Sequence, residues 1–564
     1  LVNATLIDVF EASKVAFFFW GFSGVVLAGL SLTKKDTEKR SLPGIPDWRN
    51  FIMKLKIIPR RIMKSNLFVL TIILAIAFWV RLYKINTPLA DWHSFRQADT
   101  SAVTRNYVKN GINILYPTYD DLSNIQSGKD NPKGLRFVEF PLYNVVSVLV
   151  DNIFIGYNVE ISGRLTSIFA TLGSIIFLFL LVAKYLGKKE AILTTFFFAI
   201  LPYNIYFTRV ILPEPFLVFT TLGMMYFLDR WIEKSLHFQW DVSSLREKGK
   251  IVVLFFLVLL FTISSLLVKP FAAFLLLPFA YLWVRGFRIS LLSIVGLFLF
   301  LGISLLPLLW WRSWVNHFPE GTPAYLWLLN GDGVRFKGAF FYWIFAERLG
   351  KLILGYWGLP LFLLGVLSRP KKEGWLFYVW GISLLLYITV FATGNVRHDY
   401  YQIITIPLIA IFLAKGVVFL LDAAGKSMSR FLVYFVLFVT ILFTEMFGWY
   451  YVRDFYNINH PEIVEAGFAV EKNTSDKALV IAPYFGDTAF LYQTRRAGWP
   501  IMQESVDKMI DKGADYYVNV QFDDLTKELM ANAKDPDPKK RKYKIIAETP
   551  KYVIIQLVPD QLLR

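Results

Sequence analysis

Long uninterrupted blocks of hydrophobic residues alternate along the chain with polar segments, many of them basic. A block of about 18–20 apolar residues is long enough to cross a bilayer as a helix. The pattern predicts twelve membrane-spanning helices, at 15–32, 67–82, 162–184, 189–207, 211–231, 251–268, 271–285, 288–311, 352–368, 374–393, 402–421 and 430–449. The segment 271–285 is short, so we expect it to be broken or buried. Apolar blocks without strict alternation exclude an outer-membrane β-barrel.

Basic loops predict the orientation of these helices. The loop 33–64 carries ten Lys and Arg residues against three acidic ones, which places it in the cytoplasm. Successive spanning helices cross the membrane in opposite directions. The predicted helices therefore put five further basic loops on the same side, at 188–189, 232–250, 285–288, 369–372 and 426–430. The block 15–32 resembles the apolar part of a signal peptide, but no Ala-x-Ala-like site follows it, so we expect it to remain as a helix.

Composition supports a membrane protein and excludes several other classes. Hydrophobic residues make up 55% of the 564 residues and charged residues only 18%, which is too little charge for a soluble surface. The net charge of +17 would indicate nucleic-acid binding in a soluble protein, but here the cytoplasmic loops account for it. The absence of cysteine excludes disulfides, thiolate metal sites and cysteine nucleophiles.

The chain divides into three predicted parts. Residues 1–64 form an additional transmembrane helix and its basic cytoplasmic loop, and residues 65–449 form the main transmembrane domain with a large first outer loop at 83–161. Residues 450–564 contain short β-rich runs at 478–481, 516–520, 543–548 and 552–557, separated by charged and Gly- or Pro-containing segments. This tail is predicted to be a small extracytoplasmic α/β domain.

Charged residues are concentrated in the outer loop that follows the second predicted helix. Within fifteen positions it carries Asp91, His93, Arg96, Asp99 and Arg105. Residues 97–109 have helical propensity up to Gly111, and on such a helix Arg96, Asp99 and Thr100 share one side. A carboxylate beside an arginine stays ionised and can accept a proton, while the cations can hold a phosphate. The alternative is a solvated loop with local ion pairs.

Four further polar clusters lie on the same predicted face. They are Glu139 before Pro141, Arg209 and Glu214 around a double-proline turn, Lys269 before Pro270, and the run Arg397, His398, Asp399, Tyr400 and Tyr401. Structural alternatives are a helix-start charge for Glu139, a tight hairpin for the double-proline turn and snorkelling for Lys269. Channels and transporters place polar groups near mid-helix, whereas these clusters all flank helix ends, so they predict one site at the outer membrane surface.

Four motifs, in order, carry a family resemblance: HSFRQADTSAVTRNY at 93–107, VEFPLYN at 138–144, RVILPEP at 209–215 and HDYYQIITIP at 398–407. With them the chain resembles GT-C membrane glycosyltransferases of the family 39-like type, which includes protein O-mannosyltransferases and the aminoarabinose transferases that act on lipid A. The segments 486–500 and 513–517 are also typical of the periplasmic domains of this group. The likeness covers about residues 67–564.

The resemblance implies a polyprenyl-phosphate-linked sugar as donor, an extracytoplasmic protein, lipid or glycan as acceptor, and an inverting transfer in the cell membrane. In this family an acidic residue of the first outer loop acts near the acceptor hydroxyl. The Asp-Glu pair that the family often has there falls on Arg96 and Gln97, so the acid must be Asp99 or Asp91. Glu139 and Glu214 match acidic residues of the later motifs.

The predicted chemistry is a single displacement at the anomeric carbon. Asp99 or Asp91 accepts the acceptor proton, with Glu139 as the next candidate. The predicted donor-binding residues are His93, Arg96, Arg105, Arg209, Glu214, Lys269, Arg397, His398, Tyr400 and Tyr401. Five histidines without paired spacing predict no metal site, although a divalent cation held by carboxylates stays open. The alternative function is a non-enzymatic lipid-handling or scaffold protein on the same fold.

Overall fold

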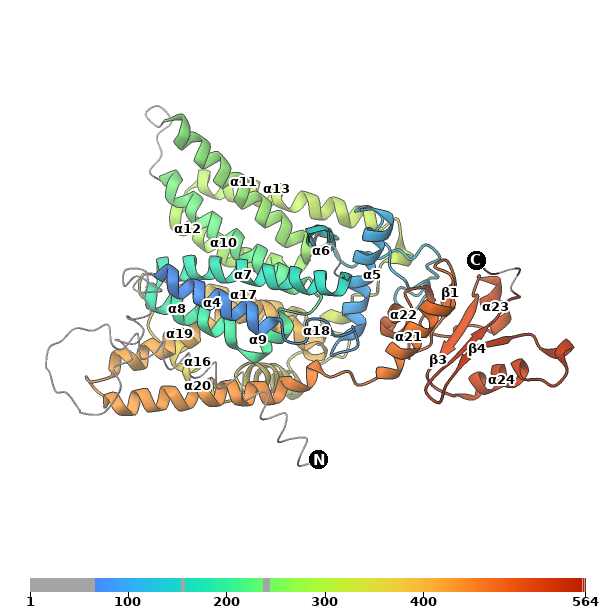
Figure 1. Cartoon of the computed structure of the whole chain (residues 1–564). Helices are drawn as coiled ribbons and strands as arrows, with labels where there is room; N and C mark the ends of the chain where they lie inside the picture. Colours follow the sequence, from blue (N-terminus) through green and yellow to red (C-terminus); the bar gives the residue numbers. More distant parts are fainter. Residues whose placement is uncertain (1–65, 154–157, 237–243, 560, 562, 564) are drawn as a thin grey trace, which may run out of the picture. The chain divides into compact units, whose positions relative to one another are not determined.

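A computed structural model describes residues 66–153, 158–236, 244–559, 561 and 563; the predicted helix 15–32 and the loop 33–64 lie outside the described residues. Figure 1 shows the arrangement of the elements. Before the C-terminal domain, the α-helices are α4 (Asn66–Arg81), α5 (Ser94–Asn110), α6 (Leu142–Ile153), α7 (Val159–Tyr185), α8 (Lys188–Ile200), α9 (Pro202–Phe207), α10 (Glu214–Leu236), α11 (Leu245–Val268), α12 (Leu276–Phe287), α13 (Leu291–Val315), α14 (Trp327–Asn330), α15 (Gly338–Phe341), α16 (Leu359–Leu367), α17 (Leu376–Val390), α18 (Ala392–Arg397), α19 (Ile406–Ala423) and α20 (Arg430–Val452). The 3₁₀-helices are η1 (Pro270–Leu275), η2 (Pro319–Gly321), η4 (Asp399–Thr405) and η5 (Arg453–Tyr456), and η3 (Tyr342–Ile353) is a π-helix.

A helix lies in each of the eleven predicted spans that fall within the described residues. Six helical segments of the described chain are long and apolar enough to cross a membrane, and α4 and α17 are shorter apolar helices. The predicted break near 271 is confirmed, because Pro270 starts a 3₁₀ turn before α12. The predicted single span 189–207 is divided at Pro202 into α8 and α9, since proline supplies no amide donor to continue the helix.

One predicted boundary is wrong. The segment 352–368 was expected to be one spanning helix, but α16 covers only nine residues of it. The π-helix η3 precedes α16, and Gly355, with a φ of +52°, lies in the turn between them. A Cβ at Gly355 would meet the carbonyl oxygen of Thr444 at 2.6 Å, so the chain bends there where it packs against α20.

Two glycines allow α16 and α19 to approach each other closely. A Cβ at Gly416 would lie 1.9 Å from the carbonyl oxygen of Leu361, and one at Gly365 would lie 1.8 Å from that of Phe412. Small residues at such contacts let membrane helices pack backbone to backbone. The buried α19 therefore lies directly against α16.

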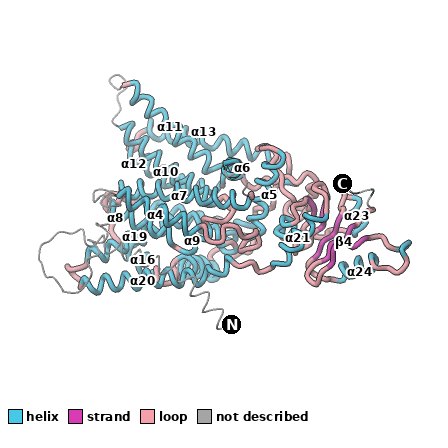
Figure 2. The backbone as a smooth tube through the Cα atoms, viewed as in Figure 1, coloured by secondary structure: helices cyan, strands magenta, loops and turns pink. Residues whose placement is uncertain are grey.

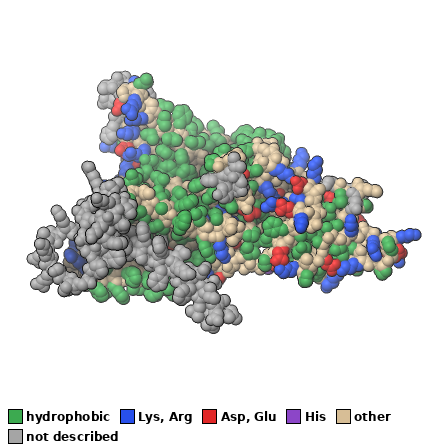
Figure 3. All heavy atoms as spheres, in the orientation of Figure 1, with side chains coloured by type: hydrophobic (Ala, Val, Ile, Leu, Met, Phe, Trp, Pro, Cys, Tyr) green, Lys and Arg blue, Asp and Glu red, His purple; other side chains and the backbone are tan. Residues whose placement is uncertain are grey.

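Hydrophobic side chains face outward along the long helices. On the face shown in Figure 3 they cover α11 and α13, whereas Lys, Arg, Asp and Glu gather over the C-terminal domain. Exposed large side chains on these two helices include Phe256, Leu260, Phe298, Leu306 and Trp310. An apolar outer face of this extent indicates contact with lipid.

The C-terminal domain is an α/β unit, as predicted. It contains α21 (Pro461–Asn473), β1 (Leu479–Ile481), α22 (Thr488–Gln493), β2 (Ala497–Trp499), α23 (Val506–Asp511), β3 (Tyr516–Asn519), α24 (Asp524–Ala533), η6 (Pro538–Lys540), β4 (Lys544–Glu548) and β5 (Val553–Gln556). The strands form one sheet in the order β2-β1-β3-β5-β4, in which β1 pairs parallel with β2 and β3, and β5 pairs antiparallel with β3 and β4. Figure 2 shows these strands in magenta beside the helices of the domain. All four predicted strands are present, and β2 is an additional one.

The packing of α16 on α19 can be tested with Gly416→Ala. The added methyl group would meet the backbone of α16, so we expect a loss of about 1–3 kcal/mol of stability, seen as a lower unfolding temperature of the purified protein in detergent. Gly302→Ala in α13 is the matched control, because nothing lies within 4 Å of its Cβ position. An equal effect of the two substitutions would contradict the close approach of the helices.

Candidate functional site

Helix α5 and the residues before it form the centre of the candidate site. The predicted helix 97–109 is confirmed, and it ends where Gly111 adopts a φ of +88°. At its start His93 adopts the left-handed conformation, with φ 57° and ψ 34°. Non-glycine residues in this conformation are uncommon and cluster at functional sites. In this conformation the His93 side chain does not cap α5, and its ring lies near the rings of His398 and Tyr400.

An aspartate after α18 joins the two segments. Asp399 Oδ1 lies 2.5 Å from His93 Nε2, and its Oδ2 accepts a hydrogen bond of 3.0 Å from Trp92 Nε1. The buried Tyr203 hydroxyl donates to the backbone carbonyl of Asp399. The ring of Tyr400 stands edge-on to His93, with 5.0 Å between the ring centroids. These contacts fix the imidazole of His93 through a carboxylate, as in sites where a histidine must keep one orientation.

Four buried charged groups from separate segments form a second network beside the first. Glu139 accepts from Arg96 of α5 and lies 2.5 Å from Lys269 Nζ, and Lys269 also forms an ion pair of 3.0 Å with Glu214 at the start of α10. Burial alone would raise the pKa of Glu139, but Arg96 and Lys269 outweigh it and lower the pKa to about 2. Glu139 is therefore ionised at neutral pH and is a weak proton acceptor.

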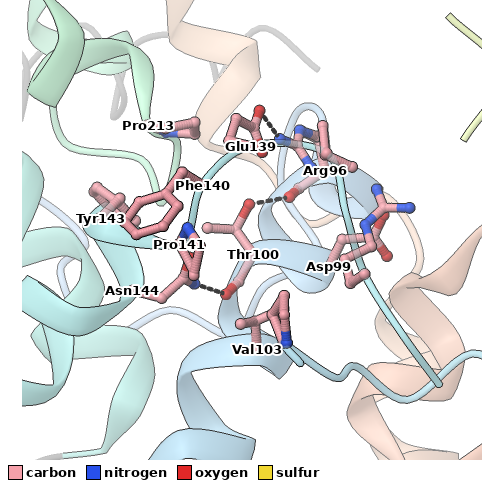
Figure 4. A pocket seen from close by; sticks show the side chains of 13 residues that line it. Arg96, Asp99, Thr100, Val103, Glu139, Phe140, Pro141, Tyr143, Asn144 and Pro213 are labelled. Carbon is pink, nitrogen blue, oxygen red and sulfur yellow. Dashed lines mark hydrogen bonds and ion pairs between the residues drawn. The ribbon is translucent and has the colours of Figure 1, made fainter. Parts of the chain in front are cut away.

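Asp99 is also fully engaged. It is 2% exposed, and its carboxylate lies 2.6 Å from Arg136 Nη2 and accepts a hydrogen bond of 2.7 Å from the hydroxyl of Thr488 in α22. Gln126 also lies within 3.4 Å of Asp99. The predicted common side of Arg96, Asp99 and Thr100 is confirmed, because all three line one small cavity (Figure 4).

Asp91 has a different environment. It neither caps α5 nor pairs with Arg96. Its Oδ1 accepts a hydrogen bond of 2.8 Å from Gln97, and its Oδ2 has no hydrogen-bond partner among the described residues although Asp91 is only 5% exposed. A buried carboxylate oxygen without a partner is costly.

Two cavities lie along α5 and its entry. The cavity in Figure 4, between Arg96 and Glu139, has a volume of about 20 Å³, which is room for about one water molecule. The other has a volume of about 310 Å³ and lies between the start of α5 and the C-terminal domain. Its lining consists of Ala90, Asp91, Trp92, His93, Ser94, Phe95, Asn459, His460, Ile463, Tyr484 and Asp487.

Asp487 brings a second carboxylate to the larger cavity. Its side chain caps α22 by accepting a hydrogen bond of 2.7 Å from the Ala489 amide. Burial raises the pKa of Asp487 to about 6, and the nearby Asp99 carboxylate adds to this increase. The group is therefore mostly ionised at pH 7 and becomes neutral as the pH falls below about 6.

Of the remaining predicted donor-binding residues, some lie at the site and others lie elsewhere in the fold. Burial lowers the pKa of His398 to about 4, with a further decrease from His93, so His398 is neutral at pH 7 and does not supply the positive charge expected of it. The His398 ring lies against Tyr400 and Tyr401, with centroid distances of 5.3 and 5.7 Å. The ammonium group of Lys269 lies 5.9 Å from the centroid of the Tyr401 ring.

Two predicted donor-binding arginines, Arg105 and Arg397, are paired with acids elsewhere, and a third, Arg209, is only partly engaged, because its Nε and Nη1 have no hydrogen-bond partner among the described residues. Arg105 pairs with Asp120 and lies over the Tyr492 ring of the C-terminal domain. The buried Arg209 donates a hydrogen bond of 2.8 Å to the carbonyl of Lys84. The exposed Arg397 forms a two-pronged pair with Asp332, with distances of 2.7 and 2.6 Å. In this arrangement the three arginines connect segments of the fold.

The sequence predictions gave no role to three residues that the structure brings into the site, although Asp399 belonged to a predicted polar cluster. Asp399 lies inside the fourth motif, Asp487 lies inside the segment 486–500, and Arg136 lies two positions before the second motif. A signal for Asp487 was present, because Asp before a short helical run is a typical N-cap. Within the described residues, no group of three or more His, Asp or Glu side chains is arranged to hold a metal ion.

Comparisons with known proteins identify the fold. The structure is similar to the crystal structure of ArnT from Cupriavidus metallidurans bound to undecaprenyl phosphate, with 12% sequence identity, a TM-score of 0.55, and coverage of 88% of this chain and 98% of that chain. It is also similar to the archaeal oligosaccharyltransferase AglB from Archaeoglobus fulgidus in complex with an inhibitory peptide and a dolichol-phosphate, with 13% identity, a TM-score of 0.52, and coverage of 86% and 74%.

A further AglB structure, a complex with Zn and sulfate, matches with 13% identity, a TM-score of 0.51, and coverage of 84% of this chain and 71% of that chain. No protein-family profile and no curated protein sequence matches the chain. At these identities the likeness concerns the fold, and the chain has the GT-C fold of membrane glycosyltransferases that its four sequence motifs predict.

Proposed function

We propose that this protein is an integral-membrane glycosyltransferase that moves a sugar from a polyprenyl-phosphate donor to an extracytoplasmic acceptor. One observation carries the proposal: charged residues from four distant segments converge at one end of a GT-C fold, and the residues just before α5, Asp91 among them, line a second, larger cavity. The ArnT neighbour binds undecaprenyl phosphate and the AglB neighbour binds a dolichol-phosphate, which supports a lipid-phosphate donor here.

Arg96 and Lys269 are the groups best suited to hold the donor phosphate. Both are buried beside Tyr400 and Tyr401, and each keeps N–H donors beyond those used on Glu139 and Glu214. The adjoining cavity of about 20 Å³ is too small for a phosphate, so binding requires these side chains to move apart. A phosphate would then take over cation contacts now made by Glu139, which stabilises the charge that develops as the phosphate departs.

Asp91 is the carboxylate best placed to act as base. Asp99 is held by Arg136 and Thr488, and Glu139 by two cations, and Glu214 pairs with Lys269 away from this lining. Asp91 lines the larger cavity, and its buried Oδ2 has no hydrogen-bond partner among the described residues. In the proposed step the acceptor oxygen forms a bond to the anomeric carbon while the bond from that carbon to the phosphate oxygen breaks. The electron pair leaves with the lipid phosphate, and the acceptor proton passes to Asp91.

The site and the C-terminal domain are proposed to lie outside the cytoplasm. The basic turns before α8 and between α19 and α20 lie at the end of the helices opposite to α5 (Figure 1). Positively charged loops are retained in the cytoplasm, so the end that carries α5 is on the other side. The protein is thus proposed to be a multi-pass protein of the cell membrane.

Asp91→Asn should lower turnover by about 10²–10⁴-fold with little change in donor affinity. Asn can still accept the hydrogen bond from Gln97 but cannot take the acceptor proton. Turnover is measured as product formed on surface glycans, by mass spectrometry of a deletion strain that expresses each variant. Binding of undecaprenyl phosphate to the purified protein is measured separately.

Asp454→Asn is the matched control for this substitution, because Asp454 is largely exposed and outside the cavity, and it should keep normal turnover. If Asp91→Asn keeps more than about a third of wild-type turnover, Asp91 is not the base. His93, whose ring also lines the cavity, then becomes the next candidate.

Lys269→Met should weaken binding of undecaprenyl phosphate by about 10–100-fold, the loss of a hydrogen bond between charged groups. Lys415→Met provides a matched control, since Lys415 forms a buried ion pair of 3.0 Å with Glu373 away from the site. Breaking either pair leaves a buried carboxylate and should cost about 3–5 kcal/mol of stability. Equal loss of lipid binding in both variants would remove Lys269 from the donor site.

Single cysteines test the proposed orientation, and the native chain has none to remove. An impermeant thiol reagent applied to intact cells should label Asn473→Cys in the C-terminal domain. It should leave Ser427→Cys, in the exposed turn between α19 and α20, unlabelled until the membrane is permeabilised. Labelling of Ser427→Cys in intact cells would place the site in the cytoplasm.

A further inference from the structure

The larger cavity is formed jointly by the entry to α5 and the C-terminal domain. Asp91, His93 and Phe95 contribute one wall, and Tyr484 and Asp487 contribute another. The two parts are tied together here, because the Trp92 amide donates to the Phe455 carbonyl at 3.1 Å and the two rings stack with 5.0 Å between centroids. At about 310 Å³ the cavity is at the lower end of the range of about 300–1,000 Å³ for small-molecule sites. It therefore fits a terminal group of an acceptor rather than an extended segment.

The lining of this cavity has the chemistry of a site for hydroxyl groups. Two carboxylates, Asp91 and Asp487, and the amide of Asn459 offer acceptors, and Trp92 and Tyr484 offer aromatic surfaces. The unpartnered Oδ2 of Asp91 belongs to a side chain more than nine-tenths buried in this lining, so the acceptor capacity is present without a protein donor. Hydroxyl groups that donate to carboxylates form strong, charge-assisted hydrogen bonds.

The charges of the lining exclude one class of ligand. It contains no lysine or arginine, and its two histidines are each engaged with an acid, His93 with Asp399 and His460 with Glu462. A phosphate or carboxylate placed here would face two anionic side chains without a cation to compensate. Like charges at such a separation disfavour binding strongly.

We propose that this cavity binds the terminal sugar of an uncharged glycan acceptor, and that Asp487 selects against anionic acceptors. The inference rests on the proposed transferase function and specifies the acceptor class of that same site. In this proposal Asp487 is a specificity-determining residue that accepts a hydrogen bond from a hydroxyl group of the acceptor, and Asp91 accepts the proton of the hydroxyl group that reacts. The C-terminal domain therefore contributes a ligand-contacting side chain to the site in the membrane part.

Ligand-detected NMR on the purified full-length protein tests the class of acceptor. The probes are maltotriose and chitotriose as neutral glycans, trigalacturonic acid and a sugar phosphate as anionic ones, and a serine-containing peptide. Undecaprenyl phosphate binding is measured in the same preparation. We expect at least one of the two neutral glycans to bind, and we expect the anionic probes and the peptide not to bind.

Asp487→Asn should weaken binding of the neutral glycan about tenfold, because a charged acceptor becomes neutral. Asn still caps α22, so the fold is retained. Asp523→Asn is the matched control: Asp523 caps α24 in the same domain by accepting a hydrogen bond of 2.8 Å from the Thr526 amide, outside the cavity. Asp487→Lys should allow trigalacturonic acid to bind.

The outcomes separate this inference from the proposed function. If undecaprenyl phosphate binds but the anionic probes or the peptide bind better than the neutral glycans, or if no probe binds, the acceptor class proposed here is wrong while the donor assignment stands. Equal effects of Asp487→Asn and Asp523→Asn would also overturn the role of Asp487. If undecaprenyl phosphate does not bind, the proposed transferase function fails, whichever glycan binds.

Discussion

The buried ion network of Arg96, Glu139, Lys269 and Glu214 is the interaction on which the site end of this protein depends. Two cations and two carboxylates are removed from water together, and each group is compensated only by the others. Networks of this kind add little net stability, because the desolvation of each charge offsets most of the attraction. Apolar side chains of similar size would hold the segments together as well, so stability alone does not explain the network.

The residues of this network lie at the points where the backbone enters or leaves a helix. Lys269 lies between the end of α11 and Pro270, where the helix cannot continue, so its side chain projects from a break rather than from the lipid-facing surface. Glu214 begins α10 and Glu139 precedes Pro141 and α6. Each charge thus sits where a helix starts or ends, which keeps ionised groups out of the apolar centre of the bundle.

Much of the fold follows from local patterns in the sequence. Hydrophobic blocks gave the helices, alternating β-rich runs gave four strands, and Gly111 marked the end of α5. Strand β2 was missed, because three residues between charged and proline-containing segments carry no periodicity. The π-helix η3 was missed for a related reason, since its register depends on packing against α20 and not on composition.

The site was predictable in part. The charged motifs pointed to segments that the structure brings together, and it joins Arg96, Glu139, Glu214 and Lys269 as one network. The partners of individual groups were not predictable, because they come from far along the chain: Thr488 donates to Asp99 from 389 positions away. Tertiary contacts from Thr488 and Arg136 show that Asp99 is occupied, and only the tertiary arrangement shows that Asp91 Oδ2 is left without a hydrogen-bond partner.

The link between α22 and α5 has a consequence for modularity. The hydroxyl of Thr488 satisfies a carboxylate on α5, and the adjacent Asp487 caps the same short helix while lining the cavity. Arg105 further down α5 reaches Tyr492 at the other end of α22. A C-terminal domain transplanted from another protein of this fold would therefore have to bring a matching α5 with it. Helix α5 and the C-terminal domain are therefore expected to change together. A change in acceptor preference would arise by paired substitutions across this contact rather than by exchange of the domain alone.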